Sequence, residues 1–348
     1  MKKIRIGILF GGQSTEHEVS LLSAKGMIEA LDTDKYEPVL IHIDKQGVWS
    51  VGDSSEILAV VPGRGVKAVV ILASGVPIPL DVVFPILHGV HGEDGTVQGL
   101  LRLAGLPFVG ADVLGSAIGM DKDVMKRLLR EAGLPVGKFL VVSIQEKDFY
   151  SYENFVEELG LPFFVKPANT GSSVGVSKVK DRETFEAAIQ EAFLHDKKIL
   201  VEEFICGREI ECSILGNQAL GVSLPGEIIS SHEFYSYEAK YLDEKGAELV
   251  VPVFLEEKIL RRVQNLAIEA ATVLCVEGMA RVDFFLTQDS NVFINEINTI
   301  PGFTKISMYP KLWQVSGLPY GALLDRLIQL ALERTTVIQE SNTVISSS

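Results

Sequence analysis

Short apolar runs alternate with helical segments over the first part of the chain. Three of these runs are typical of strands and lie at positions 4–10, 36–44 and 81–87. Apolar residues then recur at helical spacing between 96 and 104, and Gly105 is placed to end that helix. Strands and helices in alternation build a parallel sheet with helices on its faces. We therefore predict an α/β domain with a doubly wound, largely parallel sheet at residues 1–120.

Strands and helices alternate less strictly in the rest of the chain. Residues 121–209 contain strand-like runs and helical segments in an order that favours an antiparallel α+β domain. Residues 210–334 show the same mixture and include two adjacent strands joined by the turn residues Gln-Asp-Ser. The aromatic-rich segment at residues 225–250 is predicted to form a long loop, which is typical of a lid. We expect three domains, followed by a polar tail at 335–348.

The overall charge limits the partners that the chain can have. It carries 32 lysines and arginines against 46 aspartates and glutamates, and the net charge of −14 argues against binding to nucleic acid or to an anionic membrane. No apolar run approaches the roughly 20 residues that span a bilayer. The cysteines Cys206, Cys212 and Cys275 form no C-x-x-C pair and are typical of a reducing compartment. We therefore expect a cytoplasmic protein without nucleic-acid or membrane partners.

Two neighbouring predicted strands carry charged residues among apolar ones. Arg281 and Asp283 in RVDFF are two residues apart, as are Glu296 and Asn298 in FINEIN, so each pair shares one face of its strand. A buried carboxylate without a partner is too costly to keep. If the two faces coincide, two carboxylates and an amide meet, and these are ligands that suit Mg²⁺. The alternative is a salt-bridged strand pair that faces solvent; the Glu-x-Asn pattern inside an apolar strand favours the metal.

Two further segments predict contacts with a nucleotide. The loop ANTGSSVG, residues 168–175, consists mainly of small residues whose backbone N–H groups can approach a phosphate, and Lys166 lies immediately upstream. A β-hairpin turn is the alternative for this loop. The apolar strand at 199–205 contains Glu202 and is followed by Glu209, so its edge could contact adenine while Glu209 holds ribose hydroxyls. Without the surrounding motifs, a solvated strand end would be the better interpretation of that segment.

The N-terminal domain contributes two candidate loops. In FGGQSTEHEVS, a T-x-x-E capping box accounts for the second glutamate and leaves Glu16 without a structural explanation. HGVHGEDG follows a predicted strand, where open α/β sheets place their ligand sites, and His88 is its functional candidate. Glu93 and Asp94 in the same loop could equally cap the helix that follows.

Together these motifs resemble the D-alanine–D-alanine ligase family of the ATP-grasp superfamily. The similarity runs in order through GGQSTEHEVS, HGVHGEDG, MDK, VKPANTGSSVGVSKV, FYSYEAKY, RVDFF and NEINTIPGFTKISMYPKLW, and it covers nearly all of the chain except the tail. The resemblance implies an ATP-grasp fold in which the two α+β domains clasp ATP. It also implies a reaction in which ATP phosphorylates one D-alanine and the amine of a second attacks the acyl phosphate, giving D-alanyl-D-alanine for peptidoglycan precursors.

The resemblance also assigns roles to residues of this sequence. Those implied to contact the amino-acid substrates are Glu16, His88, Arg281, Gly302, Ser307 and Met308. Those implied to contact ATP are Lys122, Lys166, Ser172, Ser173, Glu202, Glu203, Ile205, Glu209 and Lys240. Those implied to coordinate two Mg²⁺ ions, with Mn²⁺ as the alternative metal, are Asp283, Glu296 and Asn298.

Several of these residues would act directly in catalysis. The resemblance implies that Glu16 lies near the ammonium group of the first D-alanine and that Ser172 and Tyr241 act with it to tie the loops over the substrates. Arg281 and the backbone N–H of Gly302 would stabilise the oxyanion of the tetrahedral intermediate. Ser307 and the Met308 backbone would hold the carboxylate of the second D-alanine.

Two alternative functions remain open at this point. One is a ligase whose second substrate is D-lactate or D-serine, although Tyr241 in the lid resembles the alanine-using pattern. The other is a nucleotide-binding regulatory protein without turnover, although none of the expected acids, amides and cations is missing. The resemblance further implies a homodimer. Product analysis and D-alanine-dependent release of ADP would separate these possibilities.

Overall fold

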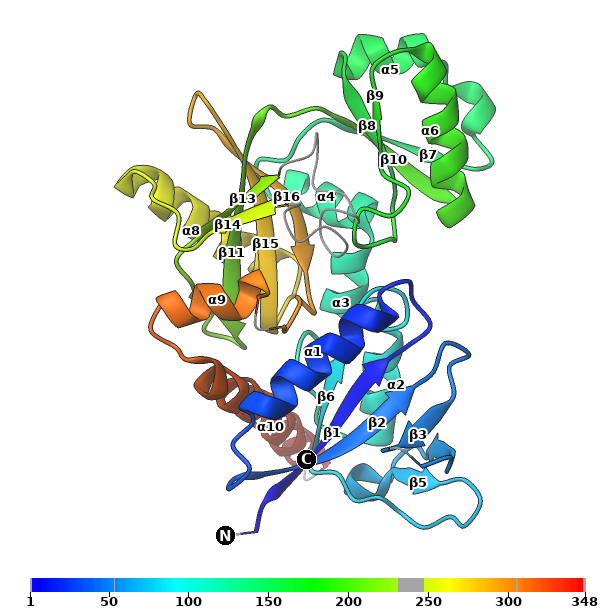
Figure 1. Cartoon of the computed structure of the whole chain (residues 1–348), viewed down its shortest axis with the longest axis vertical. Helices are drawn as coiled ribbons and strands as arrows, with labels where there is room; N and C mark the ends of the chain where they lie inside the picture. Colours follow the sequence, from blue (N-terminus) through cyan, green and yellow to red (C-terminus); the bar gives the residue numbers. More distant parts are fainter. Residues whose placement is uncertain (1, 53, 231–246, 305, 347–348) are drawn as a thin grey trace.

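The computed structural model describes residues 2–52, 54–230, 247–304 and 306–346. The N-terminal domain lies at one end of the long axis and the central domain at the other, with the C-terminal domain between them (Figure 1). The N-terminal sheet is mostly parallel, and the sheets of the other two domains are antiparallel. The predicted α/β fold class is therefore confirmed.

The N-terminal domain is built around a four-stranded sheet in the order β3-β2-β1-β6. Its elements are β1 (Ile4–Gly11), α1 (His17–Ala30), β2 (Tyr36–Ile43), β3 (Trp49–Val51), β4 (Leu58–Val60), η1 (Gly65–Lys67), β5 (Val69–Ile71), β6 (Val82–Ile86) and α2 (Thr96–Ala104). Strand β1 pairs in parallel with both β2 and β6, and every residue of β6 is buried, as expected for a strand covered on both faces. Helices α1 and α2 contribute to cores on opposite faces, so the sheet is doubly wound.

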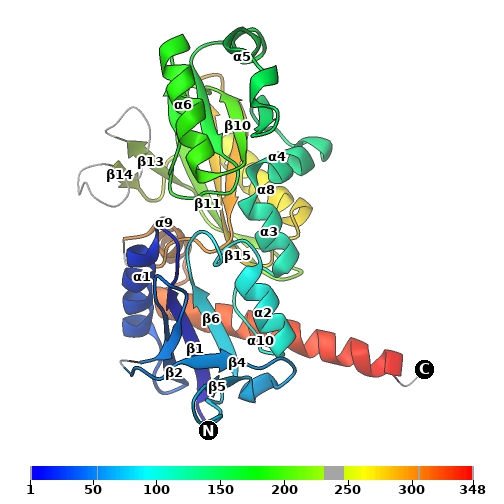
Figure 2. The same ribbon diagram turned by 90° about the vertical axis from the view of Figure 1, so that its right-hand side faces the viewer.

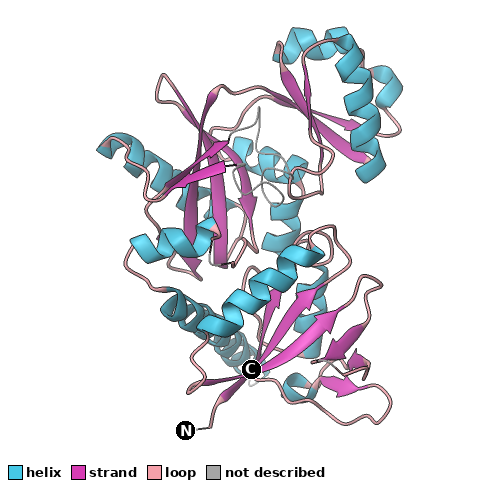
Figure 3. Ribbon diagram, viewed as in Figure 1, coloured by secondary structure: helices cyan, strands magenta, loops and turns pink. Residues whose placement is uncertain are grey.

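The central domain is an antiparallel sheet in the order β7-β10-β8-β9, covered on one face by helices α5 and α6 (Figure 3). Its elements are β7 (Phe139–Ser143), η2 (Lys147–Phe149), α5 (Tyr152–Leu159), β8 (Phe163–Pro167), β9 (Ser177–Val179), α6 (Arg182–His195) and β10 (Lys198–Glu203). Val165 and Val201 face the helices, and the residues next to them, Lys166 and Glu202, point to the opposite face. That opposite face lines a cavity.

The C-terminal domain has an antiparallel sheet in the order β14-β13-β11-β15-β16, with β12 paired to β11. Its elements are β11 (Gly207–Gly216), β12 (Gly221–Val222), β13 (Gly226–Ser230), β14 (Ala247–Val250), α8 (Glu257–Val273), β15 (Gly278–Thr287), β16 (Val292–Asn298) and α9 (Met308–Val315). Helix α8 buries Leu266 and Ala270 against the core, which also receives Val282 and Phe284 of β15. The alternate residues of β15 therefore face away from that core.

Three further helices connect the domains: α3 (Val113–Met120), α4 (Lys122–Glu131) and α10 (Tyr320–Ser346). Helix α4 was expected to begin the central domain, but its Met125 and Leu129 are buried in the core of the C-terminal sheet. Helix α10 packs Leu323 and Leu327 against the N-terminal sheet, on the same face as α1. No helix among the described residues is long and apolar enough to cross a membrane.

Helix α10 continues into the segment that was expected to be a polar tail. It extends to Ser346 and runs out beyond the body of the molecule (Figure 2). No proline or glycine follows Gly321 in the sequence, so nothing interrupts the backbone hydrogen bonding of the helix. Residues 335–346 therefore continue helix α10.

Candidate active site

A first cavity, with a volume of about 280 Å³, lies between the central and C-terminal sheets. We call it the nucleotide cavity. Each described residue that was expected at ATP lines it: Lys122, Lys166, Ser172, Ser173, Glu202, Glu203, Ile205 and Glu209. These residues come from α4, β8, the loop after β8, strand β10, the connection from β10 to β11, and strand β11. The remaining member of the expected set, Lys240, lies outside the described residues, so the structure brings together all of the set that it describes.

Two lysines flank one glutamate on the wall of the nucleotide cavity. Glu202 Oε2 is 2.8 Å from Lys166 Nζ and 3.3 Å from Lys126 Nζ. Burial alone would raise the pKa of the Glu202 carboxyl, but the two lysines outweigh it and hold that pKa below its usual value. Burial lowers the pKa of Lys126 to about 8. Lys126 is not among the residues predicted from the motifs, although its position one helical turn after Lys122 could have indicated it.

The loop ANTGSSVG, residues 168–175, which we call the Gly/Ser loop, connects β8 to β9 and borders the nucleotide cavity. The two strands pair antiparallel, so the alternative interpretation as a hairpin connection also holds. Ser172 and Ser173 both have positive φ angles, 51° and 60°, a backbone conformation that is uncommon for residues other than glycine. Lys122 Nζ donates a hydrogen bond of 2.7 Å to Thr170 O of this loop and lies 3.7 Å from Glu296 Oε2. A lysine ammonium group is therefore held between the loop and the acidic strand β16.

Strands β15 and β16 bring their charged residues onto one face, as predicted. Arg281 is opposite Asn298 in the antiparallel pair, and Asp283 is opposite Glu296. Arg281 donates to both carboxylate oxygens of Asp283 at 2.7 Å, and Asn298 Nδ2 donates to Asp283 Oδ2 at 3.0 Å. Burial works against the charge of Arg281, but Asp283 and Glu211 outweigh it and keep the pKa of the guanidinium well above its usual value.

The same face offers oxygen atoms that fit a magnesium ion. Asp283 and Glu296 supply carboxylates and Asn298 an amide oxygen, and these three side chains are only partly buried. Among the residues that the structure describes, no group of three His, Cys, Asp or Glu side chains could hold a metal alone. A metal bound here would take its other ligands from substrate phosphates and water, as Mg²⁺ commonly does.

A second cavity, with a volume of about 370 Å³, lies between the N-terminal and C-terminal domains. We call it the substrate cavity. It is lined by each residue that was expected to contact the amino acids: Glu16, His88, Arg281, Gly302, Ser307 and Met308. The two cavities share Ser172, Arg281 and Glu296 in their linings, so they meet at these side chains. Ser172 Oγ donates a hydrogen bond to Glu16 Oε1, which links the Gly/Ser loop to the N-terminal domain. The expected third member of this group, Tyr241, lies outside the described residues.

The loop after β6 joins the N-terminal domain to the segment that contains Gly302. Burial lowers the pKa of His88, so its ring is neutral at pH 7 and can donate from Nδ1 to Ile300 O at 3.0 Å. Glu93 accepts from Gly89 N at 2.7 Å and from Ile300 N at 3.1 Å. Burial and the nearby Glu16 carboxyl raise the pKa of Glu93 to about 8. Glu93 therefore links the loop after β6 to Ile300 and does not cap α2, whereas Asp94 Oδ1 accepts from Thr96 N at 3.0 Å.

Gly302 is in close contact with Ser307 at the edge of the substrate cavity. A β-carbon at position 302 would lie 2.8 Å from Ser307 Oγ, closer than real β-carbons approach other atoms. Ser307 Oγ accepts a hydrogen bond from Thr304 N at 3.1 Å and lies 2.7 Å from Thr304 Oγ1. The absence of a side chain at position 302 therefore allows this loop to close around the Ser307 hydroxyl.

Comparison with known proteins agrees with this geometry. The family profile described as "D-ala D-ala ligase N-terminus" matches residues 5–111, and the profile described as "D-ala D-ala ligase C-terminus" matches residues 128–329. The D-alanine–D-alanine ligase of Oceanobacillus iheyensis is 53% identical, with 96% of each chain covered. D-alanine–D-alanine ligase A of Escherichia coli K12 is 51% identical, with 96% of this chain and 97% of the relative covered.

Solved structures are similar over the whole chain. The D-alanine–D-alanine ligase from Coxiella burnetii superimposes with a TM-score of 0.90 at 40% identity, with both chains fully covered. The VanG D-Ala:D-Ser ligase from Enterococcus faecalis gives a TM-score of 0.86 at 36% identity, with 95% of this chain and 100% of that chain covered.

The fold and the two adjoining cavities define an ATP-grasp ligase. Within that class, the chain belongs to the D-alanine–D-alanine ligase family, whose members depend on ATP. The family predicted from the sequence motifs is confirmed.

Proposed function

We propose that the chain joins two D-alanine molecules, with ATP in the nucleotide cavity and the amino acids in the substrate cavity. The observation that carries this proposal is the junction of the two cavities at Ser172, Arg281 and Glu296. A terminal phosphate at one side of this junction would meet a carboxylate at the other. The family membership and the relatives at about half identity support the same reaction.

The residues at the junction suit an acyl-phosphate reaction. Lys122 and Lys166 supply positive charge to the ATP phosphates while the carboxylate of the first D-alanine attacks the terminal phosphorus and ADP leaves. The amine of the second D-alanine then attacks the acyl carbon. The bond between this carbon and the phosphate oxygen breaks, and inorganic phosphate leaves. Arg281 and the Gly302 N–H lie in the substrate cavity, where they stabilise the tetrahedral oxyanion between these two events.

The acidic side chains of β15 and β16 would hold Mg²⁺ beside ATP. We assign Asp283, Glu296 and Asn298 to two Mg²⁺ ions, with Mn²⁺ as the alternative, because their oxygen atoms lie on one face near both cavities. When bound, the metal neutralises phosphate charge during transfer. Glu16 and His88 complete the site for the first D-alanine. Ser307 and Met308 form the site for the carboxylate of the second.

D-alanine is the second substrate that the relatives favour. The relatives at 53%, 52% and 51% identity are all named as D-alanine–D-alanine ligases, whereas the D-Ala:D-Ser ligase from Enterococcus faecalis is 36% identical.

The reaction needs only small molecules, so we infer no nucleic-acid or membrane partner. We also propose that the chain acts in the cytoplasm, where ATP is available and the free cysteines stay reduced. A homodimer remains part of the proposal, to be tested by light scattering.

ADP release in the presence of D-alanine tests the proposed function directly. We expect release with ATP, Mg²⁺ and D-alanine, and little with L-alanine in its place. Offering D-alanine, D-lactate and D-serine together at neutral pH and analysing the product identifies the second substrate. Predominant ester, or a dipeptide that contains D-serine, would overturn the assignment of D-alanine. ADP release that is independent of D-alanine would overturn the ligase reaction itself.

A further inference from the structure

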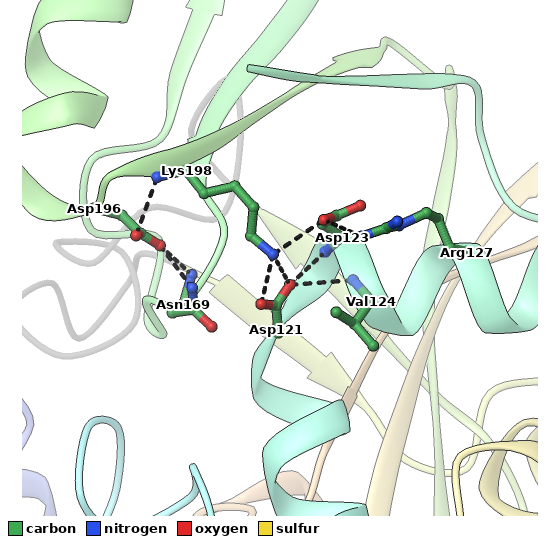
Figure 4. A network of polar contacts seen from close by, with 7 residues as sticks. All are labelled: Asp121, Asp123, Val124, Arg127, Asn169, Asp196 and Lys198. Carbon is green, nitrogen blue, oxygen red and sulfur yellow. Dashed lines mark hydrogen bonds and ion pairs between the residues drawn. The ribbon is translucent and has the colours of Figure 1, made fainter. Parts of the chain in front are cut away.

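Lys198, the first residue of β10, contacts two aspartates at the start of α4 (Figure 4). Its Nζ lies 2.8 Å from Asp121 Oδ1, 2.6 Å from Asp121 Oδ2 and 3.0 Å from Asp123 Oδ2. Burial works against the charge of Lys198, but these hydrogen bonds outweigh it and raise its pKa above the usual value. One lysine ammonium group therefore holds two neighbouring carboxylates together.

The two aspartates fix the beginning of the helix that carries Lys122. Asp121 Oδ1 accepts hydrogen bonds from Asp123 N and Val124 N, each at 3.1 Å, and so caps the N-terminus of α4. Asp123 Oδ2 also accepts from Arg127 one turn later, at 2.7 Å. Lys122 is the first residue of this helix, so the position of the cap fixes the position of the Lys122 backbone from which the side chain extends.

The same cluster holds the start of the Gly/Ser loop. Ala168, at the start of the loop, is bonded on both sides: its O accepts from Lys122 N and its N donates to Lys198 O, both at 3.0 Å. Asp196, two residues before Lys198, accepts from Asn169 N at 2.8 Å and from Asn169 Nδ2 at 2.9 Å. The loop that borders the nucleotide cavity is therefore anchored to the residues that flank and include Lys198.

These contacts join two bodies that pack separately. Helix α4 is buried in the core of the C-terminal domain, whereas β10 belongs to the sheet of the central domain. The nucleotide cavity lies between these two domains. An exposed ion pair would contribute little to their relative position. Here the Asp123 side chain is only 3% exposed and that of Lys198 26%, so loss of the cation would leave two adjacent carboxylates with much less solvent to screen them.

We propose that Lys198 is a positioning residue for ATP: its hydrogen bonds to Asp121 and Asp123 set the position of Lys122 and of the Gly/Ser loop relative to the phosphates. Lys198 does not line either cavity, so it acts through these other groups. The inference rests on the proposed function, because it assumes that ATP phosphates occupy this part of the nucleotide cavity. It predicts an effect on nucleotide use that is separate from amino-acid binding.

The test is steady-state kinetics of the full chain with each substrate varied in turn. Lys198→Met keeps the length of the side chain and removes its charge, and we expect kcat/KM for ATP to fall about tenfold or more, as for loss of charge-assisted hydrogen bonds. KM for D-alanine should stay at the wild-type value, and equilibrium binding of ADP should weaken. Lys198→Arg, which can still contact both carboxylates, should restore most of kcat/KM for ATP.

A matched control separates this role from a general loss of charge. Lys35→Met also removes a lysine that contacts an aspartate, since Lys35 Nζ is 3.0 Å from Asp325 Oδ1, but this pair lies at the N-terminal domain and is more exposed. We expect Lys35→Met to leave both KM values unchanged. A fall in kcat/KM for ATP of the same size in both variants would overturn the proposal.

Asp121→Asn tests the contact from the other side and does not depend on the folding of Lys198→Met. Asparagine caps a helix as well as aspartate does, so this variant keeps the start of α4 and removes the charge that Lys198 contacts. We expect it to raise KM for ATP, and Lys198→Met combined with it to be no worse than Lys198→Met alone. Wild-type KM for ATP in Asp121→Asn would overturn the proposal. Failure of the wild-type chain to release ADP with D-alanine would instead refute the proposed function.

Discussion

Replacing Gly302 by alanine would place a methyl group against the Ser307 hydroxyl. The new β-carbon would lie 2.8 Å from Ser307 Oγ and 3.5 Å from Ser307 Cβ, so the clash involves the hydroxyl and not the carbon. Displacing the hydroxyl breaks its contacts with Thr304 N and Thr304 Oγ1. At roughly 1 kcal/mol for each hydrogen bond, we expect Gly302→Ala to lower the free energy of unfolding by about 2 kcal/mol.

A second substitution shows whether this clash is the cause. In a Ser307→Ala background only the 3.5 Å contact remains, and it is an ordinary van der Waals distance, so Gly302→Ala should then cost little. The assay is urea unfolding of the wild type, both single variants and the double variant. D-alanine-dependent ADP release by Gly302→Ala should also fall, because both residues line the substrate cavity. Equal destabilisation in the two backgrounds would refute this reasoning.

Two further predictions concern acidic residues of the site. Glu296→Gln removes a carboxylate from the predicted metal ligands, so turnover should fall sharply at all Mg²⁺ concentrations. Circular dichroism should show that the variant is folded. Wild-type turnover would contradict the metal role. Glu93 has a folded-state pKa of about 8 against an ordinary 4.5, so its contribution to stability is present below pH 4.5 and is lost as pH rises to 8. Glu93→Gln should lack that part of the pH dependence in thermal unfolding, and an unchanged profile would show that another group causes it.

The charged strand pair was predictable from sequence because its information is local. Residues two apart on a strand share a face, and only a short turn separates RVDFF from FINEIN, so pairing of the two strands was the simplest arrangement. The structure places Asp283 opposite Glu296 as this reasoning requires. The Gly/Ser loop and Lys166 were found for a similar reason, since the residues that form the loop are consecutive.

Contacts between distant segments were not predictable in the same way. The apolar stripe of α10 was visible in the sequence, but nothing in the stripe specifies that its partner is the N-terminal sheet. Helix α4 likewise shows which of its residues are apolar without showing that they enter the core of the C-terminal domain. An apolar face of a helix indicates that the face is buried, but it does not indicate which surface covers it.

Polar residues with two interpretations were the hardest to assign. Glu93 precedes a helix, so capping explained it locally, whereas its contact with Ile300 joins positions 207 residues apart. Lys126 and Lys198 lie in ordinary helix and strand patterns, and their roles arise only from the carboxylates that the fold places beside them. Chemistry at these positions follows from the fold and is not contained in any short motif.

The position of α10 has a consequence for the order in which the protein can fold. Ile6 and Ile8 of β1 are synthesised long before Leu323 and Leu327 of α10, which complete their core. One face of the N-terminal sheet therefore remains partly open to water until α10 is made, although α1 can already cover some of it. Because the N-terminal domain contributes Glu16 and His88 to the substrate cavity, that cavity cannot be completed before α10 is made. Synthesis of α10 is thus the step that allows the core of the N-terminal domain to close.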